Sequence, residues 1–68
     1  MLGAELRKAR EATGLSQEQL GFKAEVHRTY VSMLEREQAS PTVDTLFRIC
    51  KALRIRASDL LRRVEDKR

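Results

Sequence analysis

The chain has 68 residues and a mass of 7.8 kDa, a length that supports one small core and leaves no room for a second domain. Its composition, 41% hydrophobic and 35% charged, excludes a membrane protein and a chain disordered throughout. A formal net charge of +4 favours an acidic partner such as nucleic acid.

The chain carries one cysteine, Cys50, and one histidine, His27, which exclude an internal disulfide and a Cys/His zinc site. We therefore expect no metal and no cofactor. The absence of a glycine-rich phosphate loop or a nucleophile pair argues against an enzyme. Neither a signal peptide nor a run of about 18 apolar residues is present, so we expect a cytoplasmic protein with no membrane partner.

The first two expected helices are separated by a short break at Gly14. Apolar spacings of four, three and four residues predict that the first helix buries Leu2, Leu6, Ala9 and Thr13 on one face. The sequence predicts that Ser16 caps the second helix, that Gln19 reaches back to it as in a capping box, and that Leu15 packs on Leu20 as a hydrophobic staple. This second helix is expected to be short, about two turns.

A third helix follows after the four residues 24–27, and its two faces differ in chemistry. Val31, Leu34 and Glu35 share the inward face. The opposite face carries Arg28, Thr29, Ser32, Met33 and Arg36. Arginine suits the guanine edge, hydroxyls suit either base, and methionine packs on a thymine methyl. Two short helices joined in this way are typical of a helix laid in the DNA major groove.

Pro41 disfavours helix at Ser40, and Thr42 is the expected cap of a fourth helix. The apolar face of that helix comprises Leu46, Ile49, Cys50 and Leu53. A last short helix ends the domain, which we place at residues 1–64, before a frayed charged tail at 65–68. The apolar residues here exceed what a short terminal helix buries, so either they close the monomer core or they form a homodimer interface: Ile55, Leu60, Leu61 and Val64.

Three segments together resemble the phage-repressor class (Cro/cI, or XRE) of helix-turn-helix regulators. They are GLSQEQL at 14–20, RTYVSMLER at 28–36, and SPT at 40–42 followed by the helical segment 46–61. The RTYVS segment is also similar to restriction–modification controller proteins. The resemblance implies an all-α, five-helix, lambda-repressor-like domain. It further implies a transcriptional regulator that binds an inverted-repeat operator on double-stranded DNA as a homodimer, with its third helix in the groove.

The resemblance also assigns roles to single residues. Gln17 lies where family members contact a phosphate, and Arg10 and Glu35 match a structural ion pair between the first and third helices. Base-reading is expected of Arg28, Thr29, Ser32 and Met33. Contacts to the DNA backbone are expected of Gln17, His27, Tyr30, Arg36, Gln38 and Ser40. Family glycines are replaced by Glu25, Glu37 and Arg54, each costing about 1 kcal/mol if the backbone keeps a positive φ.

Several alternatives stay open at this stage. Arg28 and Arg36 are solvated surface residues in the plainer interpretation, Met33 an exposed filler, and Tyr30 a packing residue. His27 is either a cap without a switching role or a group that makes binding pH-sensitive. Cys50 is either an inert buried thiol or a redox sensor. The same fold also serves antitoxins and protein-interaction adaptors. For a regulator, autoregulation and contact with RNA polymerase are further hypotheses.

Overall fold

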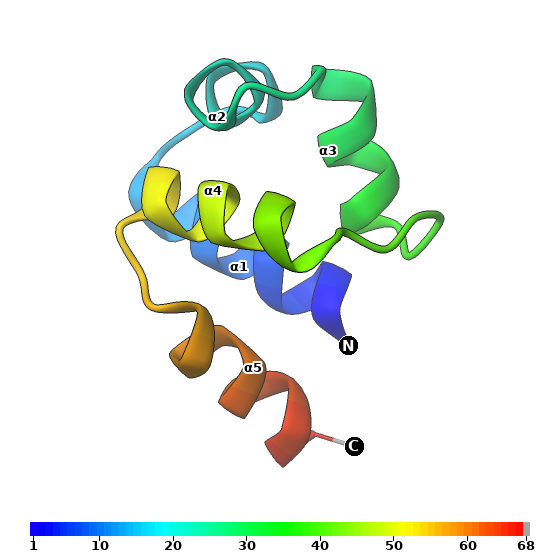
Figure 1. Cartoon of the computed structure of the whole chain (residues 1–68), viewed down its shortest axis with the longest axis vertical. Helices are drawn as coiled ribbons and strands as arrows, with labels where there is room; N and C mark the ends of the chain where they lie inside the picture. Colours follow the sequence, from blue (N-terminus) through cyan, green and yellow to red (C-terminus); the bar gives the residue numbers. More distant parts are fainter. Residues whose placement is uncertain (68) are drawn as a thin grey trace.

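The computed structural model describes residues 1–67, which form five helices joined by short turns and loops (Figure 1). They are α1 (Leu2–Thr13), α2 (Gln17–Ala24), α3 (Arg28–Glu35), α4 (Val43–Leu53) and α5 (Ala57–Asp66). Residues 1–67 contain no strand, which confirms the all-α fold class. None of these helices is long and apolar enough to cross a membrane.

The core forms where the apolar faces of all five helices meet. α2 packs on α3 and α4, while α1 packs on α3, α4 and α5, and α5 lies at the end of the molecule away from α2 (Figure 1). The buried apolar residues are Leu6, Ala9, Leu20, Ala24, Val31, Leu34, Leu46, Ile49, Cys50, Leu53 and Leu60. The apolar periodicity therefore predicted the core well. Thr13 is the exception, because it is exposed and its hydroxyl donates to the Arg10 carbonyl at 2.7 Å.

The helix ends follow the predicted local signals. Gln19 N donates to Ser16 Oγ at 3.0 Å and Ser16 N donates to Gln19 Oε1 at 2.8 Å, which completes the capping box of α2. Thr45 N donates to Thr42 Oγ1 at 3.1 Å, so Thr42 caps α4. Gly14 ends α1 with a φ of 77°, a conformation that favours glycine.

The three residues that replace family glycines all adopt the left-handed backbone conformation. Glu25, Glu37 and Arg54 have φ angles of 61°, 62° and 60°. The strain at Glu37 is offset by its carboxylate, which accepts a hydrogen bond from the buried Gly3 N in the first turn of α1. Gly3 itself allows this close approach, since a Cβ there would lie 2.5 Å from Leu34 O.

The C-terminal helix differs from the prediction. α5 runs through Asp66, so residues 65 and 66 belong to the helix and not to a frayed tail, and residue 68 lies outside the described residues. Lys67 Nζ lies 3.0 Å from Glu5 Oε2, and Lys8 Nζ lies 3.5 Å from the same oxygen. The hydrogen bond from Lys67, with the charges of both lysines, lowers the pKa of the buried Glu5 carboxyl. This long-range pair ties α5 to α1.

Cys50 lies in the core as predicted for a structural thiol. Its side chain is buried among the apolar residues of α4 and their neighbours, and burial raises the pKa of the thiol. A raised pKa keeps the thiol protonated and unreactive, so the buried, inert role is the one that the structure supports.

Candidate nucleic-acid interface

The outer face of α3 presents the side chains that were predicted to read bases. Val31 and Leu34 are buried on its inner face. Arg28, Thr29 and Arg36 are exposed, and Ser32 and Met33 are partly exposed. The structure therefore places Arg28, Thr29, Ser32 and Met33 on one accessible side of α3, and Arg36, expected at the DNA backbone, directly follows the helix as its C-cap. Tyr30, at the flank, is half-buried and packs against the core.

The start of α3 is fixed by its cap residue. Thr29 N donates to His27 Nδ1 at 3.0 Å, so an imidazole serves where a hydroxyl or carboxamide is usual. The acceptor must be the unprotonated ring nitrogen. His27 thus positions the first turn of α3, and its exposed ring lies beside the predicted base-reading residues.

The turn between α2 and α3 depends on a glycine that the sequence analysis did not single out. A Cβ on Gly21 would lie 2.7 Å from Val26 O and 3.2 Å from Arg28 N. Both are backbone atoms, which cannot move aside as a flexible side chain could. The two helices therefore approach each other at a distance that only glycine allows. A glycine in the interior of a predicted helix was the available signal.

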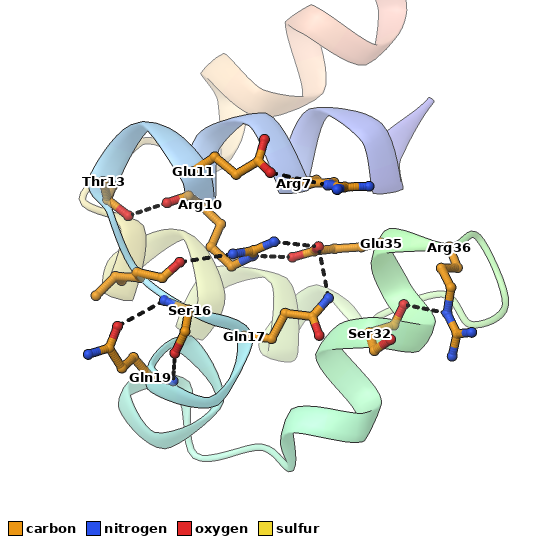
Figure 2. Close-up of polar contacts among 11 residues, drawn as sticks. Arg7, Arg10, Glu11, Thr13, Ser16, Gln17, Gln19, Ser32, Glu35 and Arg36 are labelled. Atoms are coloured by element: carbon orange, nitrogen blue, oxygen red, sulfur yellow. Dashed lines mark hydrogen bonds and ion pairs between the residues drawn. The ribbon is translucent and has the colours of Figure 1, made fainter.

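A buried polar network fixes α3 against α1 and α2. Figure 2 shows Arg10, from α1, and Gln17, from α2, pointing toward Glu35 on α3. Arg10 Nε lies 2.6 Å from Glu35 Oε2 and Arg10 Nη2 lies 3.0 Å from Oε1, a bidentate pair. A third donor, Arg10 Nη1, reaches Leu15 O at 2.9 Å, and Gln17 Nε2 donates to Glu35 Oε1 at 3.1 Å.

This network is nearly closed to solvent. The Arg10 side chain is 12% exposed and the Glu35 side chain 3% exposed. The hydrogen bonds to Glu35 and its negative charge raise the pKa of Arg10. The structural ion pair that the sequence analysis expected is therefore present. Gln17, expected at a phosphate, has one of its side-chain N–H groups turned inward to the same carboxylate.

The remaining residues expected at the DNA backbone lie at the two ends of α3. His27 precedes the helix, while Arg36, Gln38 and Ser40 follow it, and all four are exposed. The loop after α3 carries no lysine or arginine between residues 37 and 47. Backbone contacts there would come from amides and hydroxyls, which leaves a weaker electrostatic component than basic loops provide.

Comparison with known proteins identifies this arrangement. The family model described as Helix-turn-helix matches residues 6–60, which include all of α2, α3 and α4. The chain belongs to the helix-turn-helix family. Its α2, turn and α3 are the motif, and the family is one of DNA-binding transcription regulators of the controller and repressor type.

Individual members of the family resemble this helix-turn-helix protein over most of its length. It is 37% identical to the control protein C.BamHI of Bacillus amyloliquefaciens over 62 residues, covering 90% of this chain and 76% of the relative. The crystal structure of the restriction-modification controller protein C.AhdI from Aeromonas hydrophila matches with a TM-score of 0.85 and 37% identity, covering 87% and 89% of the two chains. The structure of the biofilm regulator SinR in complex with DNA matches with a TM-score of 0.83 and 31% identity, covering 90% and 98%.

The residues expected at a dimer interface divide into three groups in this helix-turn-helix protein. Leu60 is fully buried in the protomer core and cannot contact a second chain, so its prediction as an interface residue is wrong. Ile55 and Val64 are half-buried. Leu61 is 44% exposed. α4 adds two exposed apolar residues that the sequence analysis did not consider, Val43 and Phe47, one turn apart.

An ion pair on the motif surface was also missed. Arg28 Nη1, at the start of α3, lies 2.9 Å from Glu18 Oε2, in the first turn of α2. The two residues are ten positions apart and belong to different helices. No helical spacing therefore relates them, and only the packing of α2 on α3 brings them together.

Proposed function

We propose that this helix-turn-helix protein binds an inverted-repeat operator as a homodimer, with α3 of each protomer in the major groove, and that it controls its own gene. The observation that carries the proposal is the outer face of α3, where the base-reading residue types are gathered on one accessible side. The bidentate Arg10–Glu35 pair holds that face in a fixed position. Similarity to the control proteins supports the regulatory part.

The chemistry of the outer face suits direct readout. The proposed base-reading residues are Arg28, Thr29, Ser32 and Met33. An arginine fork donates to the O6 and N7 atoms of guanine, hydroxyls serve either base, and methionine packs on a thymine methyl. The proposed backbone contacts are Gln17, His27, Tyr30, Arg36, Gln38 and Ser40, which lie on α2, on α3 and at its ends. They would fix the docking position without reading sequence.

A homodimer is supported by exposed apolar residues far from the base-reading set in sequence. Val43 and Phe47 of α4 and Leu61 of α5 are exposed on two helices that pack against each other, and we define these three as the α4–α5 apolar surface. The described chain measures 29 × 23 × 22 Å. Two such bodies in contact can therefore present their α3 helices about 34 Å apart, the spacing of successive major grooves.

The test is selection of DNA from a random pool, followed by footprinting of the DNA upstream of the gene over a series of salt concentrations. We expect an enriched inverted repeat whose half-sites lie about 34 Å apart centre to centre, and protection of that repeat upstream of the gene. Binding without an enriched sequence, lost as salt is raised, would contradict the proposal and leave only attraction by the +4 charge. A stoichiometric second protein in place of DNA would favour an adaptor.

A further inference from the structure

We propose that Glu18 is a positioning residue for Arg28: its carboxylate holds the arginine side chain in place and so sets the base selectivity of α3. The inference rests on the proposed function, because it concerns an arginine that reads a base. Glu18 itself contacts neither base nor phosphate in this proposal. It acts through Arg28.

The contact joins the two helices of the motif at the edge of the base-reading face. Arg28 Nη1 lies 2.9 Å from Glu18 Oε2, an ordinary length for a charge-assisted hydrogen bond. Arg28 is the first residue of α3 and Glu18 is the second residue of α2. The carboxylate is thus held on a helix whose start is fixed by the capping box and whose spacing from α3 is fixed by Gly21.

Stability does not account for this ion pair. The side chains of Arg28 and Glu18 are 65% and 73% exposed, and pairs so open to water contribute little to folding. A carboxylate beside a DNA interface also repels phosphates, which lowers affinity for every sequence alike. A benefit of the ion pair that offsets this general loss of DNA affinity must therefore come through its other partner, Arg28.

Fixing the guanidinium plane provides that effect. A guanidinium has five N–H donors in a rigid fork, and the contact with Glu18 uses a donor on Nη1. The other donors remain for a bidentate contact with a guanine edge. A free, exposed arginine loses rotamer freedom when it docks, whereas one already held by a carboxylate loses less. A fixed fork also fits alternative bases less well, because it cannot turn to meet them.

The experiment has two steps, so that failure of the inference is separate from failure of the proposed function. Selection with the unaltered protein first defines the operator, and no enriched operator would defeat the proposed function. Arg28→Ala then locates the base pair whose discrimination depends on Arg28. Affinities of Glu18→Ala are measured for the four base pairs at that position and for DNA without an operator.

We expect Glu18→Ala to lower discrimination at that one base pair by about two- to tenfold, the effect of releasing one side chain. We also expect its affinity for DNA without an operator to rise, because a negative charge is removed. The matched control is Glu11→Ala, which breaks an exposed ion pair of α1, Glu11 Oε2 to Arg7 Nε at 3.3 Å, and should leave discrimination unchanged. Thermal unfolding of each variant establishes that the fold is retained.

Three results would overturn the inference. Equal rises in affinity for all four base pairs would show that Glu18 is only a repelling charge. Greater discrimination in Glu18→Ala would show that the ion pair withholds Arg28 from the base. A loss of selectivity from Glu18→Ala that persists in the Arg28→Ala background would show that Glu18 acts independently of Arg28.

Discussion

Arg10 brings a guanidinium into the junction of α1, α2 and α3, where its side chain is 12% exposed. Three of its nitrogens donate hydrogen bonds, two of them to Glu35 and one to a backbone carbonyl. A buried charge pair is costly to desolvate, and it becomes far costlier when one partner is removed. The network therefore makes the position of α3 depend on a residue of α1.

We expect Arg10→Ala to lower the free energy of unfolding by about 3–5 kcal/mol, because it leaves the Glu35 carboxylate buried without a cation. Since small domains have total stabilities of about 5–15 kcal/mol, this loss is a large fraction of the whole, and urea unfolding followed by circular dichroism should show a midpoint at a much lower urea concentration. Arg7→Ala, which breaks only an exposed pair, is the control and should change stability by about 1 kcal/mol or less. A comparably small change for Arg10→Ala would contradict this role.

One of the ion pairs was predicted from the sequence, and two others were not. The Arg10–Glu35 pair was expected because a glutamate on an inward helical face requires a cation or donors. Glu5 and Glu18 were not singled out, although both form ion pairs. Arg28 belongs to another helix and Lys67 follows α5, so no local spacing relates either of them to its carboxylate; only Lys8, three residues after Glu5, is a local partner. Pairings of this kind depend on how the helices pack.

At the scale of helices, three residues at or just after helix ends adopt a strained, left-handed backbone conformation. Glu25 ends α2 and Arg54 ends α4 in the left-handed conformation, in which a side chain is strained. Glu37 follows α3 in the same conformation but has a compensating hydrogen bond to Gly3 N. The three residues therefore share one backbone conformation, but only at Glu37 does a side-chain hydrogen bond offset the strain.

Glycine substitutions separate these effects. We expect Arg54→Gly and Glu25→Gly each to raise the free energy of unfolding by up to about 1 kcal/mol, and so to raise Tm by a few degrees. Glu37→Gly should instead leave stability unchanged or lower it, because the carboxylate that accepts from Gly3 N is lost. Thermal unfolding of the three variants checks the order. An equal rise in all three would show that the Glu37 hydrogen bond contributes nothing.

The spacing of α2 and α3 provides a second prediction at this scale. Gly21→Ala adds a Cβ that would lie 2.7 Å from Val26 O, so the start of α3 must shift. We expect operator affinity to fall by about tenfold or more, because base contacts tolerate little displacement, while helix content is retained. Ala4→Ser, an exposed change on α1, serves as a control with unchanged affinity. Retained affinity in Gly21→Ala would mean that the turn adapts.

Helix positions, caps and turns were largely predictable because they depend on neighbouring residues. Ser16 with Gln19, and Thr42, cap their helices as the sequence indicated. The end of α5 was not predictable, since the last turn is supported by Lys67 meeting Glu5 across 62 residues of sequence. Leu60 was misassigned for a related reason. The apolar pattern of the last helix grouped Leu60 with Leu61 and Val64, but only the packing of α5 shows that the Leu60 side chain points into the core.

For the whole molecule, the α4–α5 apolar surface leads to a prediction about assembly. Phe47 is 58% exposed and Leu61 44% exposed, so charged replacements there should not disturb the protomer core. We expect Phe47→Asp and Leu61→Asp to sediment as monomers and to bind the operator about 10²- to 10⁴-fold more weakly, because the two half-sites are no longer linked. Phe22→Asp is the control for sedimentation alone, since Phe22 is exposed on α2, outside this surface, but lies one turn from Glu18 beside the proposed DNA interface. Dimers formed by Phe47→Asp would move the interface elsewhere.

Acid sensitivity is a further whole-molecule property, because Glu5 joins the two terminal helices. The pKa of Glu5 is lowered by its hydrogen bond with Lys67, so the charged carboxylate stabilises the folded state. This stabilisation is present above the ordinary glutamate value of 4.5 and is lost as the pH falls below it. We expect Glu5→Gln to be less stable than the unaltered protein at neutral pH but to lose less stability on acidification. Urea unfolding at several pH values measures both, and parallel pH profiles would exclude this role.

The burial of Cys50 has a practical consequence for measuring how often the folded molecule opens. Its thiol is sealed in the core and kept protonated, so a water-soluble alkylating reagent reaches it only in molecules that have transiently unfolded around α4. The rate of modification in plain buffer, divided by the rate for the fully unfolded chain, then gives the population of open molecules when opening and closing are fast. Addition of operator DNA should slow that reaction as its occupancy rises, which turns the single cysteine into a gauge of binding.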